Sequence, residues 1–259
     1  ASSLPKDTLP ILVVFFASTL LVIGLSFVTC RILNLQKEKI GTFIQSAFRG
    51  NLAYIGLPIL IFALHGEPKE AVSGVVAQTM FVLAPSMLLY NGIAVPLLVG
   101  SKEGFSPSKR RQVLMKLVRN PLILASMGGI LFFLFPYPLP VVLLNTLELI
   151  GQMAAPSALV CVGGAMAFVS MQGRFRSAII ASVLKVVLLP SLSLFLVSFI
   201  EIDPHARLVL LVLSACPTAV ASYIMVKELD GDEALSAGSI VISTLLSIPV
   251  MALLLAFQH

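Results

Sequence analysis

The sequence predicts an all-α polytopic membrane protein in which two of the membrane-spanning helices are broken and cross each other. Of its 259 residues, 58% are apolar and only 11% are charged, and the mean hydropathy is +1.03. Polar and helix-breaking residues interrupt two of the apolar stretches, at 48–58 and at 215–223. A soluble domain with a single core does not reach this apolar content, so the composition excludes a water-soluble fold.

Runs of about 20 apolar residues are long enough to cross a bilayer as helices. Eight such spans are predicted, with short loops between them, at 9–32, 41–64, 71–99, 115–136, 139–170, 177–200, 205–226 and 234–257. The three cysteines, Cys30, Cys161 and Cys216, all lie in these spans, so neither a disulfide framework nor a Cys/His metal set is predicted.

The distribution of basic residues predicts the orientation of the chain. Most Lys and Arg residues lie in or beside the loops at 33–40, 100–119, 171–176 and 227–233, whereas the alternate loops carry few. Because basic loops stay on the cytoplasmic side, both ends of the chain are predicted outside, in a plasma membrane or a bacterial inner membrane. The basic loop 100–119 then faces anionic lipid, and nucleic-acid binding is not predicted.

The two interrupted spans read FRGNLAYIGLP, from Phe48 to Pro58, and ACPTAVASY, from Ala215 to Tyr223. Lipid offers no hydrogen bonds, so irregular backbone at this depth is stable only inside protein or beside a water-filled cavity. A pair of interrupted spans in corresponding halves of a chain is the sequence feature that best predicts a transporter's binding site.

A weak internal repeat places the two interrupted spans in equivalent positions. The segment after each span has an acidic Gly-containing turn followed by Glu-Ala-x-Ser, from Glu70 and from Glu233. The copies lie five spans apart, an odd number, which predicts an inverted repeat. Residues 1–99 then form a partial first repeat of three spans, and 115–259 a complete second repeat of five. The chain begins with Ala1, and two helices of an expected ten are predicted to be lacking at its start.

Five ordered motifs resemble those of the auxin efflux carrier family: Asn51 to Pro58, NPLILA at 120–125, AAPSALVCVGGAMA at 154–167, LKVVLLP at 184–190 and ACPTAVASY at 215–223. This family includes plant auxin exporters and bacterial carriers for malonate, malate and related acids. The resemblance implies ten spans in two inverted repeats, an architecture related to bile acid sodium symporters, with two broken helices crossing at mid-membrane. One departure is Gly50, where the plant carriers have proline.

The crossing of two half-helices predicts an anion site, because each helix N-terminus carries about half a positive charge. The candidate substrate-binding residues are Asn51, Gly50, Gly56, Pro58, Pro217 and Thr218. The resemblance places the asparagine against the substrate carboxylate. The structural alternatives are an interhelical hydrogen bond for Asn51, close packing at the glycines, and an ordinary kink whose freed carbonyl is satisfied by Thr218.

Charged residues within the spans are candidates for coupling or charge pairing. Glu148 and Lys185 are both predicted at depth, where Glu148 is suited to carry a proton and Lys185 to pair with an anion or a carboxylate. The alternatives are a protonated structural carboxyl group and a lysine whose ammonium reaches the inner surface. Arg49 is expected to reach that surface.

No HExxH, Walker or GxSxG motif is present, so neither an enzyme nor an ATP-driven pump is predicted. The sequence favours secondary active transport of small organic anions by alternating access, without cofactor or metal. Proton coupling and a homodimer are both compatible with this sequence. A sodium-coupled symporter of the bile acid type remains an alternative. A channel or a receptor-like helical bundle that does not transport is the alternative of another class.

Overall fold

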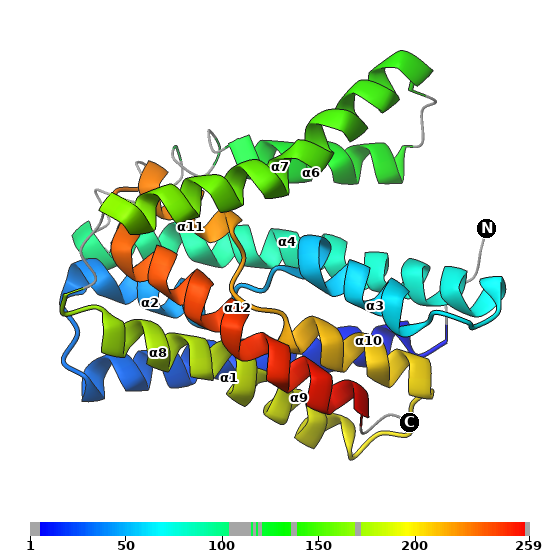
Figure 1. Ribbon diagram of the computed structural model, residues 1–259, viewed down its shortest axis with the longest axis horizontal. Coiled ribbons are helices and arrows are strands. Elements are labelled where there is room, and N and C mark those ends of the chain that lie inside the picture. Colours follow the sequence, from blue (N-terminus) through cyan, green and yellow to red (C-terminus); the bar gives the residue numbers. More distant parts are fainter. Residues whose placement is uncertain are drawn as a thin grey trace.

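The computed structural model describes residues 6–103, 115, 118, 121–135, 139–168 and 172–256, which are helical apart from turns and one isolated β-bridge (Figure 1). The first part of the chain contains α1 (Thr8–Ile32), α2 (Lys37–Phe48), the π-helical turn η1 (Leu52–Gly56), α3 (Leu57–Ala63) and α4 (Lys69–Glu103). The second part contains α6 (Pro121–Leu134), α7 (Val141–Phe168), α8 (Phe175–Val183), the π-helical turn η3 (Leu184–Leu188), α9 (Leu189–Val197), α10 (Pro204–Ala215), α11 (Ala221–Glu228) and α12 (Glu233–Ala256).

Within the part of the chain that the structure describes, four continuous helical segments are long and apolar enough to cross a membrane: Thr8–Ile32, Lys69–Ser101, Phe175–Val197 and Glu233–Ala256. Shorter apolar helices cover Leu52–Ala63, Val141–Met153 and Pro204–Ala215. The predicted spans 41–64 and 205–226 are each divided into two helices, because the chain leaves helical geometry at 49–51 and again after Ala215. Parts of the predicted span 115–136 and of the basic loop lie outside the described residues.

The interrupted helices α2 and α10 occupy the interior of the bundle. Every residue of 41–52 and of 208–220 is buried. α2 packs against α1, α4 and α8, and α10 packs against α1, α9 and α12. Gly41 permits the close approach of α2 to α4, since a Cβ atom there would lie 2.7 Å from the backbone oxygen of Leu97. The helix that is least apolar in sequence, α2, is therefore enclosed by protein.

The helices α6 and α7 lie at one edge of the bundle in this view, and one end of α7 projects beyond the other helices (Figure 1). α6 contacts α4, and α7 contacts α11 and α12. All residues of 141–150 in α7 are exposed. The prediction that Glu148 is buried is therefore wrong for the described chain, because no described helix covers its face of α7.

Buried hydroxyl groups along the helices are mostly satisfied within their own helix. Ser18, Thr19, Ser26, Thr79 and Ser86 each donate to the carbonyl oxygen four residues earlier, at 2.6–2.8 Å. This bonding lets small polar residues pack between helices without an unsatisfied donor.

Candidate functional site

The chain breaks at two places that lie against each other inside the bundle, which we call the helix crossing (residues 49–51 and 216–220). α2 ends at Phe48, and Arg49 adopts an extended conformation with φ −78° and ψ 104°. α10 ends at Ala215, and Cys216 is likewise extended with φ −52° and ψ 136°. Pro217 contributes to the second break because it has no N–H to continue the helical hydrogen bonds.

Backbone hydrogen bonds join the two breaks. Asn51 N donates to Pro217 O at 2.8 Å, and Ala219 N donates to Arg49 O at 2.9 Å. Between them, Gly50 and Thr218 form an antiparallel β-bridge. Each break therefore satisfies the other's freed backbone groups, which is what irregular backbone at membrane depth requires.

Thr218 connects the crossing to both α2 and α12. Its hydroxyl donates to Ser46 O in the last turn of α2 at 2.8 Å, and its own N–H donates to Ser243 Oγ of α12 at 3.0 Å. Thr218 thus satisfies a carbonyl group in the last turn of α2 with its side chain and joins the crossing to α12 with its backbone. The sequence interpretation of Thr218 as a residue that merely satisfies its own kink is too local, because the hydroxyl bonds to the other interrupted helix.

Two cations are buried at the crossing. Arg49 is 3% exposed, and its Nη1 lies 3.3 Å from Met225 Sδ. Lys185, in η3, is fully buried, and its Nζ donates to Ser214 O at 2.8 Å. The sequence predicts that Arg49 reaches the inner surface, and it gives the same position as an alternative for Lys185. Both predictions are wrong, because both side chains are buried at the crossing. Among the described residues, these are the only charged residues that are buried as a whole, and the nearly enclosed carboxylate of Asp232 is paired with Arg174 elsewhere in the bundle.

A buried amide and a buried hydroxyl lie at the crossing. Asn51 is only 5% exposed, and its side chain makes no cap hydrogen bond to η1. The hydroxyl of Tyr90 on α4 is fully buried and lies close to the backbone of Gly50, and to Arg49 and Cys216. The Tyr90 ring packs on Phe48 with 5.6 Å between ring centroids. Polar groups from α4 and from the first break thus lie together inside the bundle.

The predicted site residues are not all at the break. Gly50, Asn51, Pro217 and Thr218 form the crossing, whereas Gly56 and Pro58 follow it in a helix that continues through η1 into α3. The prediction that Gly56 and Pro58 break the helix is wrong. Gly56 is needed instead for close packing, since a Cβ atom there would lie 2.8 Å from Cys216 Sγ and from Leu213 Cδ2.

Pro58 and Glu148 both lie at the exterior of the described chain. Pro58 is exposed in the first turn of α3, where its missing N–H coincides with the π-helical turn. The described partner of Glu148 is Gln152, whose Nε2 is 3.5 Å from Glu148 Oε1. No described contact joins Glu148 to Lys185.

The sequence interpretation missed Arg49, Tyr90, Met225, Ser214 and Ser243 as neighbours of the crossing. The position of Arg49 directly before Gly50 and Asn51 was a usable signal. The other four come from different helices, and no local pattern marks them.

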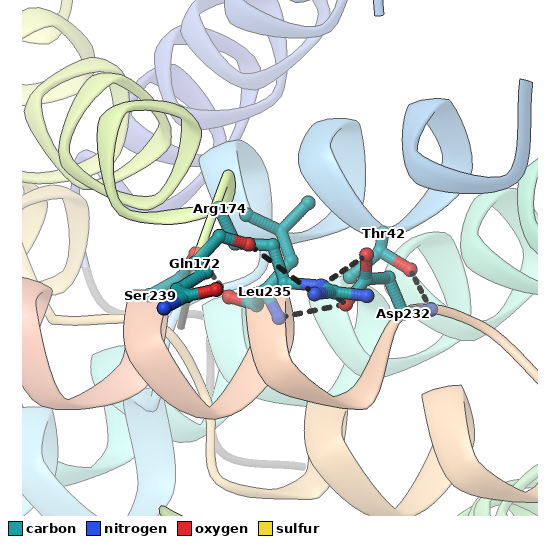
Figure 2. Close-up of polar contacts among 6 residues, drawn as sticks. All are labelled: Thr42, Gln172, Arg174, Asp232, Leu235 and Ser239. Atoms are coloured by element: carbon teal, nitrogen blue, oxygen red, sulfur yellow. Dashed lines mark hydrogen bonds and ion pairs between the residues drawn. The ribbon is translucent and has the colours of Figure 1, made fainter. Parts of the chain in front are cut away.

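A polar cluster holds the ends of α2 and α12 together at another place in the bundle (Figure 2). Arg174 Nε lies 2.8 Å from Asp232 Oδ1 and 2.9 Å from Oδ2. Asp232 Oδ1 accepts from Leu235 N at 3.0 Å, and Asp232 N donates to Thr42 Oγ1 at 3.1 Å. An open cavity of about 390 Å³ lies beside the cluster and is lined by Arg174 and four acidic residues, Glu38, Asp230, Asp232 and Glu233. These contacts fix α2 relative to the turn that precedes α12.

Interrupted apolar helices that pair in the interior of a membrane bundle are typical of secondary transporters. Comparison with known proteins agrees with this class. Residues 5–255 match the family model described as membrane transport protein. Because the match covers nearly the whole chain, the protein belongs to this family, that of the auxin efflux carriers.

A curated relative supports the same assignment. The chain is 25% identical over 259 residues to an uncharacterized transporter of Methanocaldococcus jannaschii, and the match covers 98% of this chain and 80% of the relative. The protein is therefore a multi-pass integral membrane protein of a transporter family and not of an enzyme family.

Proposed function

We propose that the protein is a secondary active carrier of small organic anions, either auxin-like carboxylates or dicarboxylates, that binds them at the helix crossing. The observation that carries this proposal is the charge of the buried interior. Arg49 and Lys185 are the only charged residues among the described ones that are buried as a whole, and both lie at the crossing. Burying a cation without a carboxylate partner is costly. A negatively charged substrate beside Arg49 offsets that cost for the guanidinium group.

The polar groups of the crossing suit a carboxylate. The Asn51 amide has two N–H donors, and Arg49 has five donors in a planar arrangement that matches two carboxylate oxygens. The described acceptor of Arg49 is the thioether sulfur of Met225, which is a weak one. A bound carboxylate is a far better partner. The half-helices that begin at Leu52 and Ala221 add the partial positive charge of their N-termini.

Transport by alternating access requires one part of the bundle to move relative to another. The helices α1–α4 and α8–α12 form the mobile part in this proposal, because they share the core that encloses the crossing. α6 and α7 belong to the scaffold, since they touch only the edges of that core. Both ends of the chain face outward, and the two interrupted spans belong to inverted repeats of which 115–259 is the complete copy.

The proposal is tested by uptake of mono- and dicarboxylates into proteoliposomes, with and without a proton gradient. Asn51→Ala removes the side-chain amide at the crossing, and Gln36→Ala is a matched control because Gln36 is exposed and its side chain makes no cap hydrogen bond. We expect saturable uptake by the unaltered chain and by the control, and about tenfold or greater loss for Asn51→Ala, the loss of one hydrogen bond to a charged group. Equal uptake by Asn51→Ala removes that residue from the site, and non-saturating flux favours a channel.

A further inference from the structure

The last turn of α10 has carbonyl groups that its own helix cannot satisfy. In an uninterrupted helix Ser214 O would accept from Thr218 N, but that N–H donates to Ser243 Oγ instead. The carbonyl of Leu213 would face Pro217, which has no N–H. The C-terminal end of α10, with its partial negative charge, therefore ends inside the bundle without the usual donors.

Lys185 supplies one of the missing donors from another helix. Its Nζ donates to Ser214 O at 2.8 Å, and the side chain is fully buried. The π-helical turn η3, which contains Lys185, lies against α10 and α2. Gly50 leaves room for the ammonium group, because a Cβ atom at position 50 would lie 3.2 Å from Lys185 Cε and 3.3 Å from Nζ. The ammonium thus lies between the end of α10 and the β-bridge of the crossing.

Carbonyl groups freed at the ends of interrupted helices are where secondary transporters bind a coupling Na⁺ or proton. We propose that the Lys185 ammonium takes the place of such a cation. The positive charge that neutralises the end of α10 then belongs to a side chain and cannot dissociate. The crossing is then held together without a dissociable sodium ion. This inference rests on the proposed carrier function, and Lys185 acts in it as a positioning residue that contacts the chain rather than the substrate.

The other half of the crossing shows that satisfying a helix-end carbonyl does not require a charge. Ser46 O, in the last turn of α2, accepts from the neutral hydroxyl of Thr218 at 2.8 Å. A neutral donor avoids the cost of burying an ammonium group. The ammonium group of Lys185 therefore does more than donate a hydrogen bond. It supplies the positive charge that an inorganic cation would otherwise bring.

No cluster of acidic side chains marks an inorganic cation site among the described residues. Hard cations take several oxygen ligands, usually with carboxylates among them. The described residues contain no group of three His, Cys, Asp or Glu side chains able to hold a metal. Asp232, whose side chain is 7% exposed, is paired with Arg174 away from the crossing. At the crossing, the carbonyl oxygen of Ser214 is already bonded to Lys185 Nζ.

The test compares cations on the purified chain, using thermal unfolding and malonate uptake as separate readouts. For the unaltered chain, replacing Na⁺ with choline is expected to change neither the unfolding midpoint nor the uptake rate. Lys185→Met keeps the length of the side chain without its charge. It is expected to lower the midpoint by about 3 °C and uptake by about tenfold, with methylammonium restoring part of both. Lys69→Met is the control, since Lys69 is exposed at the start of α4.

The outcomes separate the inference from the proposed function. A requirement of the unaltered chain for Na⁺, in either readout, overturns the role of Lys185, and so does a Lys185→Met variant that matches the unaltered chain in both. If Lys185→Met does not fold, Na⁺ and choline are compared on the unaltered chain and on Lys185→Arg instead. Unfolding midpoints and uptake rates that do not depend on Na⁺ in either protein support the role of Lys185. If the unaltered chain takes up no carboxylate, the carrier proposal fails, while the thermal readout still tests Lys185.

Discussion

Replacing Arg49 with methionine separates the stability of the protein from its affinity for anions. Arg49 is 3% exposed, and the acceptor of its Nη1 is a thioether sulfur 3.3 Å away. An apolar residue of similar length removes a buried charge that the described chain satisfies poorly. Such replacements are often neutral or stabilising by about 1–4 kcal/mol. We therefore expect the unfolding midpoint of Arg49→Met to stay the same or rise, by about 2–4 °C for each kcal/mol.

The same substitution is expected to weaken binding of a carboxylate. A hydrogen bond to a charged group contributes about 1.5–3 kcal/mol, which corresponds to a loss of about 13- to 160-fold in affinity. Arg49→Lys keeps the charge but not the paired donors, so its loss is expected to be smaller. The assay is isothermal titration of purified protein with malonate and with a monocarboxylate, beside thermal unfolding of the same samples.

Arg31→Met is the matched control, because Arg31 is exposed in the last turn of α1 and its charge lies outside the crossing. Unchanged affinity in Arg49→Met would refute the role of Arg49 in anion binding. A large fall in the unfolding midpoint would refute the reasoning on its buried charge, since it would mean that the guanidinium group stabilises the fold.

Two further substitutions test packing and polar contacts around α2. Gly56→Ala places a methyl group 2.8 Å from Cys216 Sγ and Leu213 Cδ2, so we expect a loss of about 1–3 kcal/mol in the free energy of unfolding. Gly24→Ala, with no atom within 4 Å, is the control, and equal midpoints for the two variants would contradict the packing argument. Asp232→Asn removes the ion pair with Arg174, whose side chain is 34% exposed, and is expected to cost about 0.5–1 kcal/mol at low salt and less at high salt. A loss that does not change with salt would show that the contact acts through its hydrogen bonds and not through its charge.

Some features of the protein follow from local sequence alone. The apolar content and the length of the apolar runs require membrane helices, whatever their arrangement. The residues Arg49 to Asn51 and Cys216 to Thr218 contain the glycine, proline and small polar side chains at which a helix ends, and the two helices do end there. Such local conformational preferences depend on a few neighbouring residues, so one sequence is enough to predict them.

Other expectations failed because they depend on what covers a helix face. Arg49 lies near enough to a helix end to reach the surface, but its helix is enclosed by α1, α4 and α8. Glu148 lies deep within an apolar run, but its face of α7 is uncovered in the described chain. Gly56 and Pro58 have the composition of a break, yet the chain accommodates them in a π-helical turn that continues into α3.

Composition and local pattern suffice to predict a bundle of membrane helices with two interruptions and an excess of positive charge. The bond between the interruptions, from Asn51 N to Pro217 O, and the bond from Lys185 to Ser214 are visible only in the folded bundle. A freed carbonyl or N–H must find a partner inside the membrane, but any helix that packs nearby can supply it. Which helix supplies that partner depends on packing between segments far apart in the chain.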